Sequence, residues 1–246
     1  MKAPVNNMTS LAGVFLASAA LFSAGETLAA MQSSVESSKA PIVVLGASYA
    51  GGWNPGTIAE SKVIVRGVSG EQSFLTLERF AKDVVAHRPR AVILWGFIND
   101  FFRSAPQESA AVSARVRESY TKMIRLAREN GMEPIIATEV TMGFKGGAVD
   151  TVKDWVGWVM GKESYQDRIN RLVSGTNQTL VEMAKREGLL VLDLQQALNG
   201  SGNRRRSEFT ADDGSHITAA GYAAITAYAA PLIERHFAGR GAQSSR

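Results

Sequence analysis

Short apolar runs alternate with longer helical patterns along most of this chain. Five runs rich in Val, Ile and Leu, with little polar alternation, span residues 41–46, 62–66, 90–95, 133–139 and 189–193. Such runs are typical of parallel strands that are buried on both faces. Patterns with helical periodicity cover residues 72–87, 108–130, 163–187 and 218–237. We therefore predict a three-layer α/β fold with right-handed crossovers.

The helical patterns have recognisable ends. Gly131 and Gly188 stand where two helices should stop, as C-terminal caps. Thr218 precedes an Ala-rich run and is expected to be an N-cap. Neither an internal repeat nor an interior low-complexity segment interrupts the pattern, so we predict one domain over residues 40–239 and a disordered tail over 240–246.

The first 30 residues have the pattern of a secretory signal peptide. Lys2 supplies the positive charge, residues 11–22 form the apolar core, and Ala29 and Ala30 provide small residues for cleavage. The apolar stretch is short for a membrane span. We therefore expect an exported protein, periplasmic or secreted, without a stable membrane anchor and with a flexible leader over residues 31–39.

Composition narrows the classes of partner. The chain of 246 residues is long enough for one full hydrophobic core, and it contains no cysteine, which excludes a disulfide framework. Its formal charge is +4, but the charges are dispersed, so we expect no nucleic-acid partner. The basic run Arg204-Arg205-Arg206 is predicted to be a solvated loop.

Three polar stretches provide the parts of an acyl-transfer site. Ser48 closely follows the first apolar run, and Asn99 closely follows the third. In the common doubly wound order 2-1-3-4-5 these two strands are neighbours, and ligands bind at their carboxyl ends. Gly70 follows the second run at the same edge, where a glycine permits close approach of its backbone to a ligand.

The third stretch, near the C-terminus, offers a base. His216 stands in a polar loop, and Asp213 can curl back to accept a hydrogen bond from its Nδ1, which leaves Nε2 for Ser48. Asp212 is the competing carboxylate. A metal site at these residues is disfavoured because no second histidine or cysteine lies nearby in the sequence.

Together these stretches resemble the SGNH (GDSL-like) hydrolase family over about residues 41–237. The matching blocks are Gly46-Ala47-Ser48, Gly67-Val68-Ser69-Gly70-Glu71, Phe97-Ile98-Asn99-Asp100 and Asp213-Gly214-Ser215-His216. The resemblance implies a flavodoxin-like, doubly wound parallel sheet of five strands and hydrolysis of esters or thioesters without a cofactor or metal. It also implies a nucleophile at Ser48, a base at His216 and its orienting acid at Asp213. The implied oxyanion hole consists of Ser48 N–H, Gly70 N–H and the Asn99 amide.

The chain departs from the family pattern at two positions. Ala47 replaces the usual Asp of the first block, which removes some local hydrogen bonding. Phe97 stands two residues before Asn99, where the family usually has Gly, and Gly96 lies one residue further back. Either the loop carries an extra residue, or Phe97 lines the pocket.

The segment 143–162 is interpreted either as a lid or acyl-binding wall, or as a short helix packed on the core. We expect Phe97 and Trp155 to contact substrate. The wider set of aromatic residues fits an acyl pocket or the core equally: Trp53, Phe97, Phe101, Phe102, Trp155 and Trp158.

These observations favour an exported serine esterase with a Ser-His-Asp acyl-enzyme mechanism. The expected substrate is a small-molecule ester, an acylated carbohydrate or a lipid. Two alternatives stay open: an acyltransferase that uses a sugar hydroxyl as acceptor, and a non-catalytic module that binds glycans.

Overall fold

The computed structural model describes residues 39–143, 163–200 and 204–244, with the side chains of 241–244 left aside. The predicted signal peptide and nearly all of the segment 143–162 lie outside the described residues. The chain divides into two compact units, Met1–Lys39 and Ala40–Arg246, and all of the described strands belong to the second.

A six-stranded sheet with the order β2-β3-β1-β4-β5-β6 forms the centre of this unit. Its strands are β1 (Ile42–Gly46), β2 (Thr57–Ile58), β3 (Ser61–Gly67), β4 (Ala91–Trp95), β5 (Glu133–Ala137) and β6 (Leu190–Leu192). The five predicted strands are parallel to one another. The predicted order 2-1-3-4-5 is therefore confirmed.

The sixth strand corrects the predicted count of five. The two residues of β2 pair antiparallel with the start of β3. Ala59 and Glu60 connect the two strands with φ of 49° and 61°, the left-handed conformation that tight hairpins use. A strand of two residues is too short to produce an apolar pattern, which is why the sequence did not reveal it.

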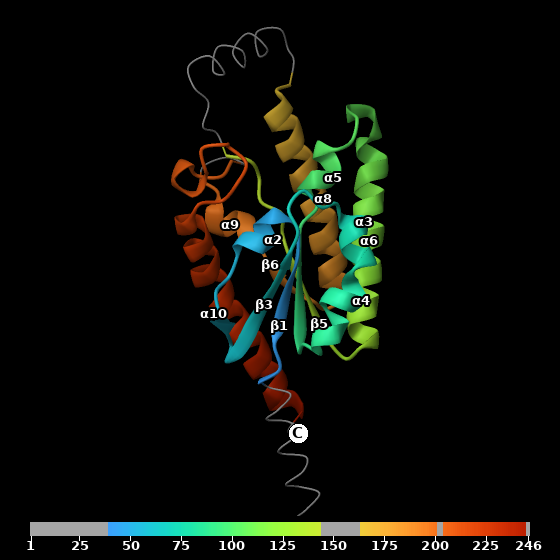
Figure 1. Cartoon of the computed structure of the whole chain (residues 1–246), viewed down its shortest axis with the longest axis vertical. Helices are drawn as coiled ribbons and strands as arrows, with labels where there is room; N and C mark the ends of the chain where they lie inside the picture. Colours follow the sequence, from blue (N-terminus) through green and yellow to red (C-terminus); the bar gives the residue numbers. More distant parts are fainter. Residues whose placement is uncertain (1–38, 144–162, 201–203, 245–246) are drawn as a thin grey trace, which may run out of the picture. The chain divides into compact units, whose positions relative to one another are not determined.

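Long helices cover both faces of the sheet. They are α6 (Ser109–Glu129), α8 (Tyr165–Arg186) and α10 (Ala219–Ser244). Shorter helical elements are α2 (Ser48–Gly52), α5 (Ile98–Phe102), α9 (Leu194–Leu198) and the 3-10 helices η2 (Pro106–Glu108) and η3 (Ser207–Phe209). Figure 1 shows α9 and α10 on one side of the sheet and α6 and α8 on the other, together with the short helices α3 (Ser73–Glu78) and α4 (Phe80–Asp83). The sheet between these layers is the core, and every residue of β1 and β4 is buried.

Helix boundaries follow the predicted signals, except at the C-terminal end of α10. Gly131 and Gly188 adopt φ of 70° and 67° just past α6 and α8, and Gly221 N–H donates to the Thr218 hydroxyl at 3.2 Å, as predicted for caps. The helix α10 continues to Ser244, into the segment predicted to be a disordered tail.

The predicted helix over residues 72–87 is divided into three pieces. These are α3 (Ser73–Glu78), α4 (Phe80–Asp83) and the 3-10 helix η1 (Val85–His87). The first break falls at Arg79, whose side chain reaches the sheet and donates to the backbone oxygens of Gly46 and Arg66. Helical periodicity does not report such a long-range contact.

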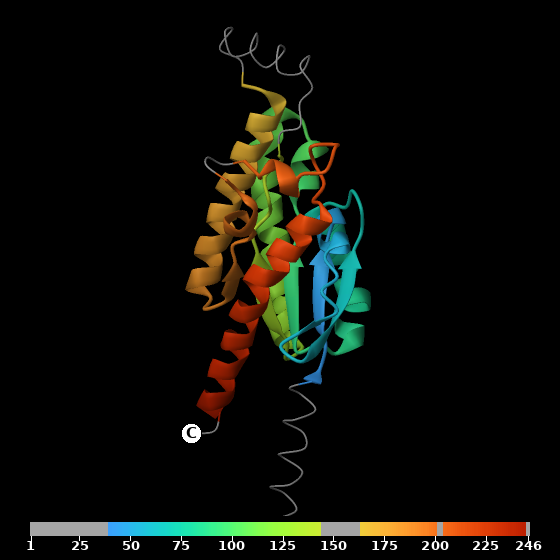
Figure 2. The same ribbon diagram turned by 90° about the vertical axis from the view of Figure 1, so that its left-hand side faces the viewer.

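The register of the sheet brings three strand ends to one edge. Gly46 of β1 pairs with Gly67 of β3 on one side and with Trp95 of β4 on the other. The chain continues from these residues to Ser48, Gly70 and Asn99, so the predicted site residues of three segments start from one line across the sheet. Figure 2 shows α2, α5 and the loop before α10 gathered at this end.

Candidate active site

Ser48 is the first residue of α2, and only Ala47 separates it from the end of β1. The turn packs closely on its neighbours, since a Cβ atom at Gly67 would lie 2.0 Å from Gly51 N and one at Gly46 would lie 1.6 Å from Trp95 O. The N–H groups of a helix's first turn have no partner within the helix. The Ser48 side chain is half-buried, and its N–H belongs to the first turn of α2.

Asp213 and His216 form a compact turn. Oδ2 of Asp213 lies 2.5 Å from His216 Nδ1, and Oδ1 accepts hydrogen bonds from the backbone N–H groups of Ser215 and His216 at 2.9 and 2.8 Å. The side-chain hydrogen bond with His216, supported by these backbone donors, lowers the pKa of Asp213 to about 2. An ionised Asp213 that accepts a hydrogen bond from Nδ1–H leaves Nε2 free to accept a proton.

Tyr49 connects the turn of Ser48 to the loop of His216. The Tyr49 hydroxyl donates to the carbonyl oxygen of Ser215 at 2.7 Å, and its ring meets the His216 ring edge-on at a centroid distance of 6.2 Å. Burial raises the pKa of Tyr49, so its hydroxyl stays a neutral donor. The first and last predicted blocks therefore lie together, although 166 positions separate Tyr49 from Ser215 in the chain.

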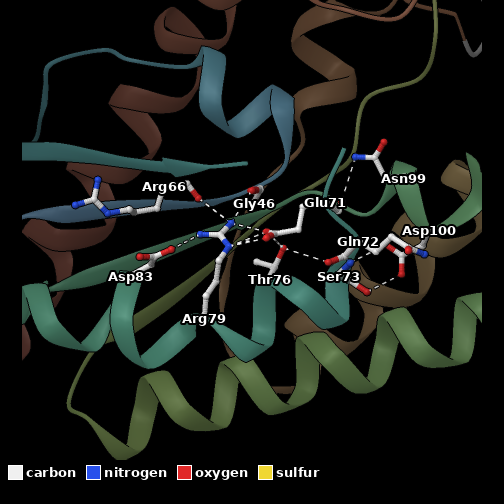
Figure 3. A network of polar contacts seen from close by, with 10 residues as sticks. All are labelled: Gly46, Arg66, Glu71, Gln72, Ser73, Thr76, Arg79, Asp83, Asn99 and Asp100. Atoms are coloured by element: carbon white, nitrogen blue, oxygen red, sulfur yellow. Dashed lines mark hydrogen bonds and ion pairs between the residues drawn. The ribbon is translucent and has the colours of Figure 1, made fainter. Parts of the chain in front are cut away.

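Asn99 connects the second and third blocks, as Figure 3 shows. It lies in the first turn of α5, and its Nδ2 donates to the backbone oxygen of Glu71 at 3.1 Å. The buried carboxylate of Asp100 accepts from the N–H and hydroxyl of Ser73 at 2.8 and 2.9 Å. Gly70, between these anchors and the end of β3, adopts a φ of 74° that favours glycine.

Arg79 anchors the same turn to the sheet (Figure 3). Its Nε donates to the Glu71 carboxylate at 2.7 and 2.9 Å, and its Nη1 donates to Asp83 at 2.7 Å. Nη2 donates to Gly46 O at 2.9 Å and to Arg66 O at 3.1 Å. One side chain thus fixes the ends of β1 and β3 relative to the turn that carries Gly70.

A sequence model of the GDSL-like Lipase/Acylhydrolase family matches residues 37–224. The chain belongs to this family. The match spans most of the chain and includes all four predicted blocks, so the resemblance seen in the sequence is confirmed. The protein is accordingly a serine ester hydrolase.

Solved structures share the fold of this GDSL-like protein. A GDSL-like lipase from Bacteroides thetaiotaomicron has a TM-score of 0.60 and 20% identity, over 80% of this chain and 89% of its own. An acetylxylan esterase from Geobacillus stearothermophilus has a TM-score of 0.59 and 16% identity, over 79% and 96%. The lipase/acylhydrolase from Enterococcus faecalis has a TM-score of 0.54 and 23% identity, over 81% and 96%. A search of curated proteins gave no significant match.

The structure accounts for the departure of the third block from the GDSL-like pattern. Gly96 adopts a φ of 150°, and Phe97 then turns its side chain into the core, where its exposed fraction is zero. Its ring lies 6.2 Å from the rings of Phe101 and Tyr120. The N–H groups of Phe97 and Ile98 donate to Oε2 of the buried Glu139 at 2.6 and 3.0 Å. The loop therefore holds two residues between Gly96 and Asn99, and Phe97 packs in the core instead of lining an open surface.

The other aromatic residues considered for an acyl pocket lie in the core, against α8, or outside the described residues. Trp53 and Phe101 are buried in the core. Phe102 stacks on Tyr165 at a centroid distance of 6.4 Å. Trp155 and Trp158 lie outside the described residues. Ala47 is the N-cap of α2 and makes no side-chain cap bond, which agrees with the expected loss of local hydrogen bonding.

Sequence reasoning missed three residues that shape this site: Tyr49, Glu139 and Arg205. A charged residue at the end of a buried apolar run was the available signal for Glu139. Arg205 corrects a prediction, because it is buried within a run expected to be solvated. Within residues 39–143, 163–200 and 204–244 no group of three or more acidic or histidine side chains could hold a metal ion. In those same ranges no helix is both long and apolar enough to cross a membrane.

Proposed function

We propose that the protein is an exported serine esterase in which Ser48, His216 and Asp213 form a catalytic triad. The contact of 2.5 Å between Asp213 Oδ2 and His216 Nδ1, in a loop joined to the Ser48 turn by Tyr49, carries this proposal. Asp213 fixes the tautomer of the imidazole, and Nε2 then serves as the base for Ser48. The pattern of the first 30 residues supports export.

The proposed reaction has two steps. Ser48 Oγ attacks the acyl carbon while its proton passes to His216 Nε2, and the same proton then leaves with the departing alcohol. Water next loses a proton to Nε2 and attacks the acyl-enzyme, which releases the acid and restores Ser48. Ser48 N–H, Gly70 N–H and Asn99 Nδ2 are the proposed donors to the oxyanion in both steps.

Short esters, including acetylated carbohydrates, are the proposed substrates. Two solved neighbours of similar fold are acetylxylan esterases, one from Geobacillus stearothermophilus. The described aromatic residues near the strand ends are mostly in the core, which also favours a small acyl group over a long one. A series of nitrophenyl esters of increasing chain length tests this proposal, with acetyl and propionyl esters expected to react fastest.

The decisive comparison is wild type against Ser48→Ala. We expect the variant to lose hydrolysis of nitrophenyl acetate and labelling by a fluorophosphonate probe. Ser61→Ala is the matched control, because Ser61 begins β3 at the opposite end of the sheet. Equal activity of wild type and Ser48→Ala would refute the triad, and labelling without hydrolysis, with acyl transfer to an added sugar, would identify an acyltransferase.

Export has its own test. Expression with residues 1–30 intact, followed by fractionation and N-terminal sequencing, is expected to give a periplasmic or secreted protein that begins at Ala30 or Met31. An intact N-terminus on a protein retained in the cytoplasm would contradict export while leaving the proposed chemistry untouched.

A further inference from the structure

Arg205 is a buried cation beside the loop that carries His216. Its exposed fraction is 3%, although its neighbours Arg204 and Arg206 are exposed. In the part of the chain that the structure describes, its Nε and Nη1 atoms are buried without a hydrogen-bond partner. Burial of a guanidinium with unpaired donors costs free energy. A contribution to stability therefore does not explain why an arginine is buried here. The other contacts of its side chain indicate a different role.

Those remaining contacts converge on one carbonyl group. Arg205 Nη2 donates to the backbone oxygen of Ser215, and the Tyr49 hydroxyl donates to the same oxygen at 2.7 Å. The guanidinium carbon of Arg205 lies 5.6 Å from the centre of the Tyr49 ring. The three residues thus form a closed triangle of contacts, and two donors restrain the carbonyl that immediately precedes His216.

We propose that Arg205 and Tyr49 are positioning residues that together hold the His216 imidazole in a fixed position relative to the Ser48 turn. This inference rests on the proposed roles of Ser48 and His216. Tyr49 directly follows Ser48 in α2 and its ring meets the His216 ring edge-on, so one residue links the turn of the proposed nucleophile to the proposed base. A misplacement of about 1 Å at a reacting group lowers a rate by about 10²-fold.

Because the two donors share one acceptor, their effects should not be independent. In Tyr49→Phe the ring packing remains and Arg205 still restrains the carbonyl, so we expect kcat to fall about fivefold. Arg205→Met should lower kcat by a similar factor. The double variant should lose about 10²-fold, more than the product of the single losses, because no donor then holds Ser215 O.

The experiment measures kcat and KM with nitrophenyl acetate, the rate of fluorophosphonate labelling, and the melting temperature of each variant. A positioning role lowers kcat and the labelling rate together and leaves KM within about twofold. Arg205→Lys is expected to retain more kcat than Arg205→Met, since an ammonium can still donate to Ser215 O. A purely structural role would lower the melting temperature and leave kcat of the folded enzyme unchanged.

Two residues of the same kinds serve as controls. Arg206 also donates to a backbone oxygen, that of Ala197 at 3.2 Å, and also lies over an aromatic ring, 4.2 Å from the centre of Phe209. Tyr228 donates through its hydroxyl to Gln196 at 3.1 Å. Arg206→Met and Tyr228→Phe should keep wild-type kcat.

The outcomes separate this proposal from the proposed function. Equal activity of wild type and Ser48→Ala would refute the triad itself. If instead the triad holds and the folded double variant keeps wild-type kcat, or if the control variants lose as much, the positioning role is wrong. Should Arg205→Met fail to fold, Tyr49→Phe decides alone, because an unchanged kcat in this nearly isosteric variant would overturn the proposal.

Discussion

The Asp213–His216 loop and the turn beside Asn99 are built in opposite ways. In the loop, the two partners are three residues apart and both side chains are about half-exposed, at 51% and 52%. Around Asn99 the polar side chains are buried and their partners are distant in the chain. Asn99 contacts Glu71, which is 28 positions away, and Glu139 contacts Phe97, which is 42 positions away.

This difference predicts which substitutions should lower activity alone and which should lower both activity and stability. A half-exposed hydrogen-bonded pair contributes little to folding because water competes for its charges. A buried network contributes through groups that would otherwise stay unsatisfied, so its loss is costly. We therefore expect changes in the loop to lower activity alone and changes beside Asn99 to lower both activity and stability.

The largest expected effect is that of His216→Ala. Loss of the proposed base should lower kcat by about 10⁴-fold or more, because the nucleophile then keeps its proton. The free energy of unfolding should change by less than about 1 kcal/mol, since the pair with Asp213 is exposed. Steady-state hydrolysis of nitrophenyl acetate and urea unfolding measure the two quantities.

His236→Ala is the matched control for this prediction. His236 Nε2, in α10, lies 3.3 Å from Oε1 of Glu133 at the start of β5, and both side chains are largely buried. This variant should keep wild-type kcat and lose more stability than His216→Ala. The reverse pattern, a stable His236→Ala and an unfolded His216→Ala, would break the proposed contrast between loop and core.

Asn99→Ala, in the buried turn, should lower both kcat and the free energy of unfolding. Removal of one oxyanion donor is expected to lower kcat by about 10²- to 10³-fold, or about 2.7–4 kcal/mol. Glu71 O also loses the hydrogen bond from Nδ2, so unfolding should become about 1 kcal/mol easier. Measurements of kcat and urea unfolding on the same preparation test both halves.

Asn130→Ala controls for the loss of an amide donor. Asn130 Nδ2 donates to Leu126 O at 2.8 Å at the exposed end of α6, far along the chain from the four blocks. Its kcat should be that of wild type. If Asn99→Ala left kcat unchanged, Asn99 would not be an oxyanion donor, and the remaining proposed donors would be Ser48 and Gly70.

The same contrast explains how much the sequence could predict. The positions of the five parallel strands, three of the four long helical regions and the Asp213–His216 contact all depend on short-range patterns, and the structure agrees with them. The break at Arg79 and the acceptor role of Glu139 depend on contacts between distant segments. Neither the period of a helix nor the apolarity of a strand contains that information.

Phe97 shows, at a single residue, what could not be predicted from the sequence. Its position two residues before Asn99 left two interpretations open, an extra loop residue or a pocket wall. The choice depends on the φ of Gly96 and on the acceptor that meets Phe97 N–H, and both are properties of the folded chain. Arg205 is similar, since burial of one arginine within an exposed run depends on the segments that cover it.

The smallest expected effect is on the pH dependence of the free energy of unfolding. Asp213 and Glu139 contribute to it with opposite pH dependence. Hydrogen bonding to His216 lowers the pKa of Asp213 from 3.8 to about 2, so its contribution to stability is full above pH 3.8 and is lost as the pH falls toward 2. Burial raises the pKa of Glu139 above 4.5, so its contribution is full below pH 4.5 and is lost as the pH rises through the folded value. Asp213→Asn should therefore flatten the acid limb of a plot of unfolding free energy against pH.

Glu139→Gln should flatten the opposite limb of that plot. A glutamine keeps a carbonyl oxygen for Phe97 and Ile98 N–H and has no proton to lose, so it mimics the neutral acid. The change at Asp213 should stay below about 1 kcal/mol because the pair is exposed to screening, and urea unfolding from pH 2 to pH 8 measures both. Glu182→Gln on the exposed face of α8 should leave both limbs as in wild type. Identical curves for Glu139→Gln and wild type above pH 4.5 would mean that burial does not control this carboxylate, and the contrast between the two regions would then rest on hydrogen bonding alone.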